Sequence, residues 1–125
     1  MNRINISRTF SFEAAHHIPN HKGACQNLHG HTYYGEVVVS SLGLDKMGMV
    51  MDYGDLKKMI NERIVDRFDH TNLNDFFDNP TAEIMVRDLF IEFTVLLDKH
   101  YGDDIRLERI NLKETANSNA WVERG

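Results

Sequence analysis

Residues 3–12 have the sequence RINISRTFSF, in which apolar side chains recur at every second position. The side chains on this apolar side are Ile4, Ile6, Phe10 and Phe12, with Arg8 as the exception. Alternation over this length is typical of a strand with one buried face. The segment therefore predicts the first strand of a sheet. A loop is expected at 13–30, where proline, glycine and asparagine accumulate, and a Tyr- and Val-rich second strand at 31–42.

From about Tyr53 the apolar spacing becomes helical. The apolar positions are Leu56, Met59, Ile60, Ile64 and Phe68. They predict one amphipathic helix, with Asp52 or Asp55 as its cap. A second helix is expected to begin at Pro80 and Thr81, because proline suits the first helical turn.

A third strand is expected at 105–114 and a short last strand at 120–123. The apolar phase of the third strand slips by one residue between Leu107 and Ile110, so we place a β-bulge near Glu108–Arg109. The predicted order, ββααββ, indicates an α+β fold. We expect a four-stranded antiparallel sheet with two helices on one face. Its two open edges need partners, and association into a ring would supply them.

Length and charge limit the class of protein. A chain of 125 residues fits a single domain, 1–125. The net charge of −5 argues against a broad nucleic-acid surface, which needs clustered Lys and Arg. No apolar run is long enough to span a bilayer, and no signal peptide is recognisable. With one cysteine the fold does not depend on a disulfide, so we expect a cytoplasmic protein with no membrane partner.

Histidines are the compositional oddity, seven in all. In His29-Gly30-His31 the two imidazoles leave an extended chain on the same side, and Gly30 removes bulk between them. A third imidazole is available at His16, His17 or His21. Three histidines with an open fourth position form a catalytic zinc site; the simpler alternative is an exposed surface pair.

Other candidate residues carry weaker local signals. Cys25 is a fourth metal ligand, an apolar filler or a reactive thiolate. Asp69-His70 is a candidate proton-carrying pair. Glu83 and Glu114 are carboxylates whose ordinary role is solvation, to which Glu83 adds a favourable place in the first turn of a helix.

Six blocks of sequence, in this order, resemble the 6-pyruvoyltetrahydropterin synthase superfamily. They are FEAAH at 12–16, Cys25 with three residues before HGH at 29–31, GMVMD at 48–52, DHTNLN at 69–74, NPTAE at 79–83 and KET at 113–115. The short spacing between the cysteine and HGH resembles the branch of 6-carboxytetrahydropterin synthases.

The resemblance implies a role for each matching residue. The zinc ligands are His16, His29 and His31; the proton-abstracting residue is Cys25, with Asp69 and His70 as its relay. Glu114 is the anchor of the pterin ring, and Thr81 and Glu83 line the same pocket. The resemblance also implies the tunnelling fold, assembled as a homohexamer of two stacked trimers with active sites at subunit interfaces.

The implied activity is zinc-dependent conversion of 7,8-dihydroneopterin triphosphate to 6-carboxy-5,6,7,8-tetrahydropterin in queuosine biosynthesis. Acetaldehyde and triphosphate are released, which makes the enzyme a lyase. Two alternatives stay open at this point: a 6-pyruvoyltetrahydropterin synthase, and a zinc- and pterin-binding protein without catalysis.

Overall fold

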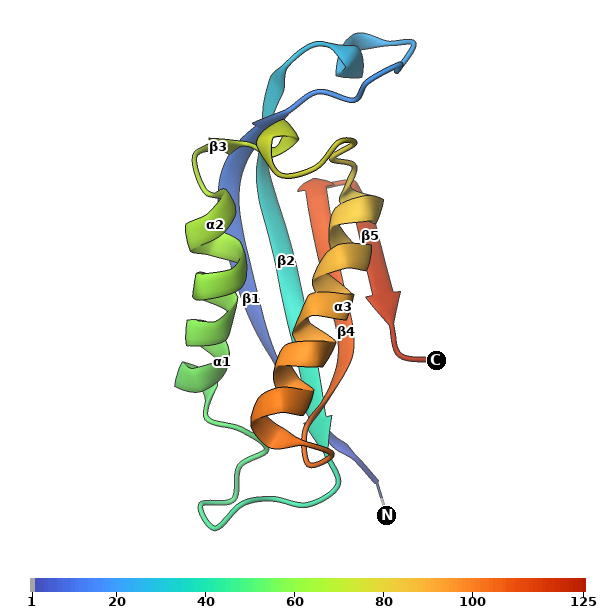
Figure 1. The fold of residues 1–125 in the computed structure, drawn as a ribbon. Helices are drawn as coiled ribbons and strands as arrows, with labels where there is room; N and C mark the ends of the chain where they lie inside the picture. The colour runs from blue at the N-terminus through green and yellow to red at the C-terminus, as the bar shows by residue number, and fades with distance from the viewer. Residues whose placement is uncertain (1) are drawn as a thin grey trace.

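A five-stranded sheet organises residues 2–125, the part of the chain that the computed structural model describes (Figure 1). The strand order is β3-β1-β2-β4-β5. The strands are β1 (Ile4–His16), β2 (His29–Ser41), β3 (Thr71–Asn72), β4 (Arg106–Thr115) and β5 (Ser118–Glu123). The four long strands are antiparallel neighbours, as predicted. The prediction of four strands missed β3, which pairs in parallel with Ala14 and Ala15. A strand of two residues is too short to show a period.

The first two strands reach further than their sequence pattern predicts. β1 continues to His16, and β2 already begins at His29, so that only residues 17–28 form the connecting loop. The alternation in fact continues through Ala14 and His16, both of which are buried. Because alanine is small and histidine is polar, Ala14 and His16 did not extend the apolar pattern of the strand. This end of the hairpin was therefore expected to be a loop.

The β-bulge is confirmed at the predicted place. Val38 pairs with Arg109 and Val39 pairs with Leu107, which leaves Glu108 as the extra residue of β4. On either side of Glu108 the side chains of Leu107 and Ile110 both reach the core.

Both predicted helices lie on one face of the sheet (Figure 1). The first comprises α1 (Tyr53–Ile60), a π-helical stretch (Asn61–Val65) and α2 (Asp66–Phe68); the second is α3 (Ala82–Tyr101). Short 3-10 turns occur at Ala24–Gln26 and Leu73–Asp75.

Side-chain caps begin both helices. Asp52 accepts a hydrogen bond from the Gly54 N–H, and the Thr81 hydroxyl accepts one from the Ile84 N–H at 3.1 Å. Pro80 therefore precedes the cap instead of standing in the first helical turn.

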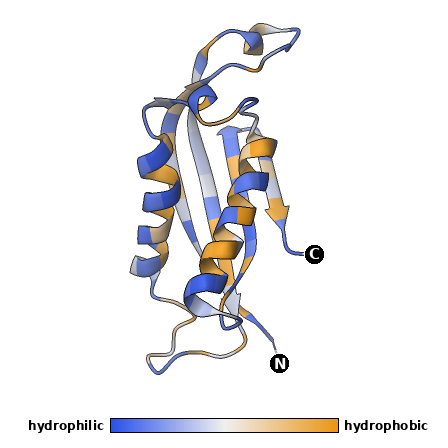
Figure 2. Cartoon of the chain, in the orientation of Figure 1, coloured by the Kyte–Doolittle hydropathy of each residue, from blue (hydrophilic) through white to orange (hydrophobic). Residues whose placement is uncertain are grey.

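The core lies between the helices and the sheet. Its fully buried side chains include Tyr33, Leu56, Phe68, Met85, Phe93 and Ile110. The helices turn their apolar stripes to the sheet and their polar sides outward (Figure 2). No helix among residues 2–125 is long and apolar enough to cross a membrane.

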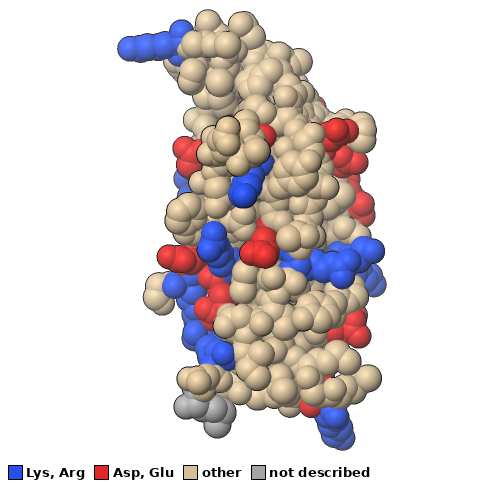
Figure 3. Space-filling model, turned by 180° about the vertical axis from the view of Figure 1, so that it is seen from behind, with Lys and Arg blue, Asp and Glu red and all other residues tan. Residues whose placement is uncertain are grey.

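Within residues 2–125 no helix lies over the other face of the sheet. Lys and Arg form a band across its middle with Asp and Glu between them (Figure 3). The Arg109 guanidinium lies 5.3 Å from the centre of the Trp121 ring, and Asn111 donates to Asn119 at 3.0 Å. Within residues 2–125 no strand covers the outer edge of β5, and β3 covers only the end of β1.

Candidate metal centre and active site

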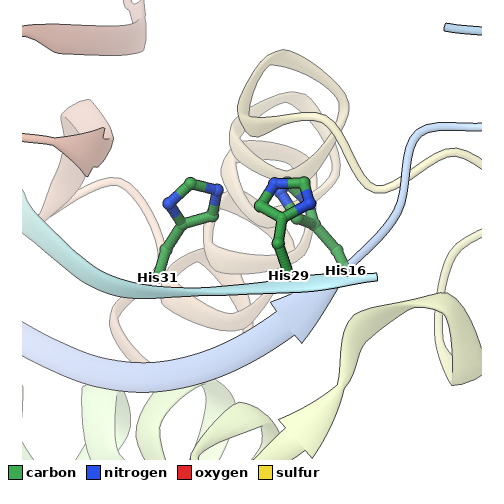
Figure 4. Close-up of side chains that lie close together, drawn as sticks. All are labelled: His16, His29 and His31. Atoms are coloured by element: carbon green, nitrogen blue, oxygen red, sulfur yellow. The ribbon is translucent and has the colours of Figure 1, made fainter. Parts of the chain in front are cut away.

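Three histidines converge at the end of the β1–β2 hairpin (Figure 4). His16 pairs directly with His29 across the two strands, and His31 follows two residues further on the same face of β2. The ring centres lie 4.7 to 5.0 Å apart. One nitrogen of each ring lies within 4.8 Å of the others. Of the three candidates for the third imidazole, the fold thus selects His16.

Hydrogen bonds to carbonyl groups fix the tautomers of two of these rings. His16 Nδ1 lies 2.7 Å from the Pro80 carbonyl oxygen, and His29 Nδ1 lies 2.8 Å from that of Asn27. A carbonyl oxygen only accepts, so each Nδ1 carries a hydrogen, and in the neutral ring the lone pair is on Nε2. Outer hydrogen bonds of this kind are typical of metal-ligating histidines.

The third ring, His31, also has a nitrogen that is available to a metal ion. His31 Nε2 is buried and has no hydrogen-bond partner among residues 2–125. Burial also lowers the pKa of His31, which favours the neutral imidazole that binds metal ions. A buried nitrogen without a partner costs free energy unless something else binds it. The residues present therefore fit a metal ion held by three imidazoles, with a further position left for substrate or water.

A cavity of about 490 Å³ lies between the start of α3 and the strands β4 and β5. Glu83 and Glu114 both line it, together with Trp121 and the apolar side chains of Val86 and Leu112. Glu114 Oε1 lies 3.7 Å from His16 Nε2, so this carboxylate stands between the cavity and the histidines. The size suits a small aromatic ligand.

Thr81 has a structural role that the sequence also signals. Its side-chain oxygen caps α3, and Thr81 is not among the residues that line the cavity of Glu83 and Glu114.

Asp69 and His70 form the predicted pair, at the outer edge of β1. Asp69 Oδ2 accepts from His70 Nδ1 at 2.9 Å, and Asp69 Oδ1 accepts the Glu13 N–H at 2.9 Å. The His70 N–H donates in turn to the Glu13 carbonyl group. The hydrogen bond from Glu13, and after it the one from His70, lowers the pKa of Asp69. His70 has a φ of 60°, rare for a residue with a side chain, and its imidazole is 76% exposed, with Nε2 3.8 Å from Glu13 Oε2.

Cys25 lies in the loop between β1 and β2, which projects beyond the end of the sheet (Figure 1). Its carbonyl oxygen accepts the Ile18 N–H at 2.7 Å, and its side chain is half-buried. Within residues 2–125 no hydrogen bond joins the thiol to the histidines or to the Asp69–His70 pair.

Sequence reasoning missed several residues that support the site. Tyr33 is fully buried with its hydroxyl 3.2 Å from His16 Nδ1, and burial raises its pKa. Asn74 binds the backbone of His17. Asn74 belongs to the DHTNLN block, which did single out the segment, but a residue that acts on a backbone has no signature of its own. Apart from its chain neighbours His29 and His31, a Cβ at Gly30 would meet only the Ala14 carbonyl oxygen, at 3.9 Å.

The fold and the three histidines together define a class: an α+β domain with a cluster of three histidines on a β-hairpin that could hold a metal ion. Comparison with known proteins then gives the family. The chain belongs to the 6-pyruvoyl tetrahydropterin synthase family, whose model matches residues 5–125.

Three curated relatives show what the chain is similar to. A protein of Archaeoglobus fulgidus, named provisionally a 6-carboxy-5,6,7,8-tetrahydropterin synthase, is 40% identical over 96% of this chain and 92% of its own length. The 6-carboxy-5,6,7,8-tetrahydropterin synthase of Synechocystis is 41% identical over 68% of this chain and 70% of its own. The dihydroneopterin monophosphate aldolase of Pyrococcus furiosus is 38% identical over 83% of each chain.

A solved structure supports the same fold. The 6-pyruvoyl tetrahydropterin synthase of Caenorhabditis elegans superposes with a TM-score of 0.84 at 25% identity, over 100% of this chain and 98% of that one. The predicted α+β tunnelling fold is thereby confirmed.

Proposed function

We propose that this chain is a zinc-dependent 6-carboxytetrahydropterin synthase, a lyase. It would convert 7,8-dihydroneopterin triphosphate and water to 6-carboxy-5,6,7,8-tetrahydropterin, acetaldehyde and triphosphate. The observation that carries the proposal is the group of His16, His29 and His31 beside the cavity of Glu114. Relatives of that name at 40–41% identity support the choice of reaction.

Glu114 is the proposed anchor of the pterin. A carboxylate can accept two parallel hydrogen bonds, from a ring N–H and from the neighbouring amino group. The position of Glu114 between the cavity and the histidines would direct the side chain of the pterin toward the metal site. Glu83 lines the same cavity and is proposed as a second polar contact, and Thr81 as a residue of the cavity rim.

The metal is proposed to be zinc, held by His16, His29 and His31. Bound zinc supplies a Lewis acid that stabilises negative charge on a side-chain hydroxyl oxygen of the substrate. Cys25, as the thiolate, is proposed to remove a proton from the substrate side chain. His70 would carry protons through Nε2, because Asp69 already holds Nδ1.

The active site is proposed to be completed between subunits. Cys25 and the Asp69–His70 pair have no hydrogen bond to each other within residues 2–125, and His70 lies at an open sheet edge. A second copy that pairs with this edge would bring its own loop toward His70. A homohexamer of two stacked trimers would satisfy the exposed edges of β1 and β5 together.

The product has a proposed destination in the cell. A carboxylated tetrahydropterin suits the synthesis of 7-deazaguanine bases, including queuosine. This pathway would place the enzyme in the cytoplasm.

A second candidate reaction is aldol cleavage of dihydroneopterin monophosphate. The relative from Pyrococcus furiosus, matched over 83% of each chain, favours it. Both reactions break a carbon–carbon bond in the pterin side chain. In the aldolase reaction the phosphate would stay on the released aldehyde.

Product analysis tests the proposal. Protein loaded with zinc is incubated with dihydroneopterin triphosphate and, separately, with the monophosphate; pterins are identified by mass spectrometry and aldehydes are trapped. Carboxytetrahydropterin with acetaldehyde supports the synthase. A phosphorylated aldehyde from the monophosphate supports the aldolase instead, and a pyruvoyl product without acetaldehyde contradicts both.

The metal ligands are tested by substitution. We expect His29→Ala and His31→Ala to lose bound zinc, measured by metal analysis after dialysis, because each removes one of three protein ligands. His100→Ala is the control, since His100 lies at the end of α3. Unchanged zinc content in the two variants would refute this ligand set.

A further inference from the structure

One side chain, Asn74, holds both backbone groups of His17. Its Oδ1 accepts the His17 N–H at 2.9 Å, and its Nδ2 donates to the His17 carbonyl oxygen at 3.0 Å. The N–H of Asn74 donates in turn to Asn72 Oδ1 at 3.0 Å. The two bonds to His17 have opposite polarity, so the amide group has only one orientation that satisfies both.

His17 is the point where the metal site and the thiol loop meet. On one side it follows the buried His16. On the other side comes Ile18, whose N–H donates to the Cys25 carbonyl oxygen at 2.7 Å. A rigid His17 therefore fixes the base of the loop and, through one further hydrogen bond, the backbone of Cys25.

The rest of the loop depends on this contact. The other backbone hydrogen bonds of residues 17–28 close within the loop: His21 to Ile18, Gln26 to Gly23 and Asn27 to Ala24. Within residues 2–125, hydrogen bonds tie the loop to other segments at two places, Asn74 at its start and the His29 imidazole at its end. Without Asn74 only the second would remain.

We propose that Asn74 is a positioning residue for Cys25: by clamping His17 it holds the thiol loop in place beside the three histidines. The inference rests on the proposed function in that it takes Cys25 as the proton-abstracting group. It adds a role for the end of the segment 69–74, whose other end carries the Asp69–His70 pair. This short segment would thus hold β1 on both sides of His16.

Two variants and a control test the clamp in the intact protein. Asn74→Ala removes both hydrogen bonds to the His17 backbone and the 3.5 Å contact of Asn74 Nδ2 with His17 Nε2. Asn74→Asp has nearly the same volume and keeps the acceptor, but its carboxylate cannot donate to the His17 carbonyl oxygen. Asn111→Ala is the control for the loss of a side-chain amide, because Asn111 is buried on the opposite face of the sheet and its amide donates one hydrogen bond, to Asn119.

Three quantities are measured: hydrogen–deuterium exchange of residues 17–28, kcat with KM, and zinc content. For both Asn74 variants we expect several-fold faster exchange in 17–28 with no change in α3. We expect kcat to fall about 10²-fold, the scale of a small misplacement of a reacting group, with KM within about twofold. Zinc content should stay at the wild-type level. Asn111→Ala should match the wild type in all three.

Several results would overturn the inference. The first is an Asn74→Ala variant whose exchange in 17–28 and whose kcat are both unchanged. The second is an Asn74→Asp variant that behaves like the wild type. The third is a fall in kcat that is explained by a loss of zinc. An Asn111→Ala variant as impaired as Asn74→Ala would also reduce Asn74 to a general stabilising role. Wild-type protein that turns over no pterin would contradict the proposed function but not the clamp, which the exchange measurement tests by itself.

Discussion

Cys25 is the residue on which the proposed chemistry depends most. It is the single cysteine, it lies in a loop, and its side chain has no part in the hydrogen-bonded core of the hairpin. We expect Cys25→Ala to lower kcat by about 10²- to 10⁴-fold, the usual contribution of a positioned base, with zinc content unchanged. Steady-state kinetics with metal analysis check this. Full activity in the variant would remove Cys25 from the mechanism.

Asp69 gives a prediction for the pH dependence of stability. The Glu13 N–H and His70 lower its pKa in the folded protein. A carboxyl group with a lowered folded pKa adds stability above its unfolded pKa, about 4, and loses it as the pH falls through the folded value. The excess unfolding free energy of wild type over Asp69→Asn should therefore be complete at pH 6 and vanish in acid.

Urea denaturation of both proteins between pH 6 and pH 3 measures this difference. Asp66→Asn is a suitable control, since no hydrogen bond or ion pair of its side chain is found within residues 2–125. A difference that grows in acid would contradict the assignment.

At the residue level the sequence predicted which histidines form the site better than it predicted the hydrogen bonds that hold them. The pair at 29 and 31 follows from strand geometry, because alternate side chains share a face. The choice of His16 over His17 and His21 depended on the family resemblance, since it requires knowing that β1 continues to pair as far as His16. The sequence could not predict the contacts of the Pro80 carbonyl group with His16 or of Asn74 with His17, because these contacts join segments more than fifty residues apart.

Among the elements, the centre of β2 has an unusual requirement at Gly35. The Phe10 ring packs over this glycine from the paired position on β1, and a Cβ at residue 35 would meet both that ring and the Asn111 carbonyl oxygen. We expect Gly35→Ala to lower the free energy of unfolding by about 1–3 kcal/mol, the cost of overpacking a core. Equilibrium urea denaturation measures it.

Gly43→Ala is the matched control for that experiment. Gly43 follows the end of β2, and a Cβ there meets nothing within 4 Å. The control should change stability little. An equal loss of stability in the two variants would contradict the Phe10 contact as the cause, because the restriction that Gly→Ala places on the unfolded chain by itself favours the folded state.

Elements with a strong period were predicted and those without one were not. The slip of apolar phase located the bulge at Glu108, because one extra residue inverts the side-chain alternation. The π-helical stretch at Asn61–Val65 left no such sign, since apolar spacing alone does not reveal a locally wider helix. The two-residue β3 is a strand only because it pairs with β1, and such pairing cannot be predicted from two residues.

For the whole molecule the main prediction concerns assembly. If Cys25 of one subunit works with His70 of another, inactive Cys25→Ala and His70→Ala chains should complement each other. Random mixing of equal amounts would restore about a quarter of the wild-type activity, because one site in four receives both intact residues. The two variants are unfolded together and refolded, and the activity is compared with that of each alone.

A double variant, Cys25→Ala with His70→Ala, mixed with wild type gives the converse result: for sites shared between subunits, exchange lowers the fraction of intact sites from about one half to about one quarter. Activity that stays at the level of the separate variants, in a mixture shown to have exchanged, would place both residues in one subunit's site.

The position of the three histidines also bears on how the chain reaches its native state. All of them lie within sixteen residues, on two strands that pair with each other directly. A metal ion would therefore close a short loop before any contact with α3 or β4 exists, and short loops are the least costly to close. Zinc present from the start should speed refolding, and the hairpin should gain exchange protection first. A metal ion bound by the three histidines would then also make the first tertiary contact that a newly made chain acquires.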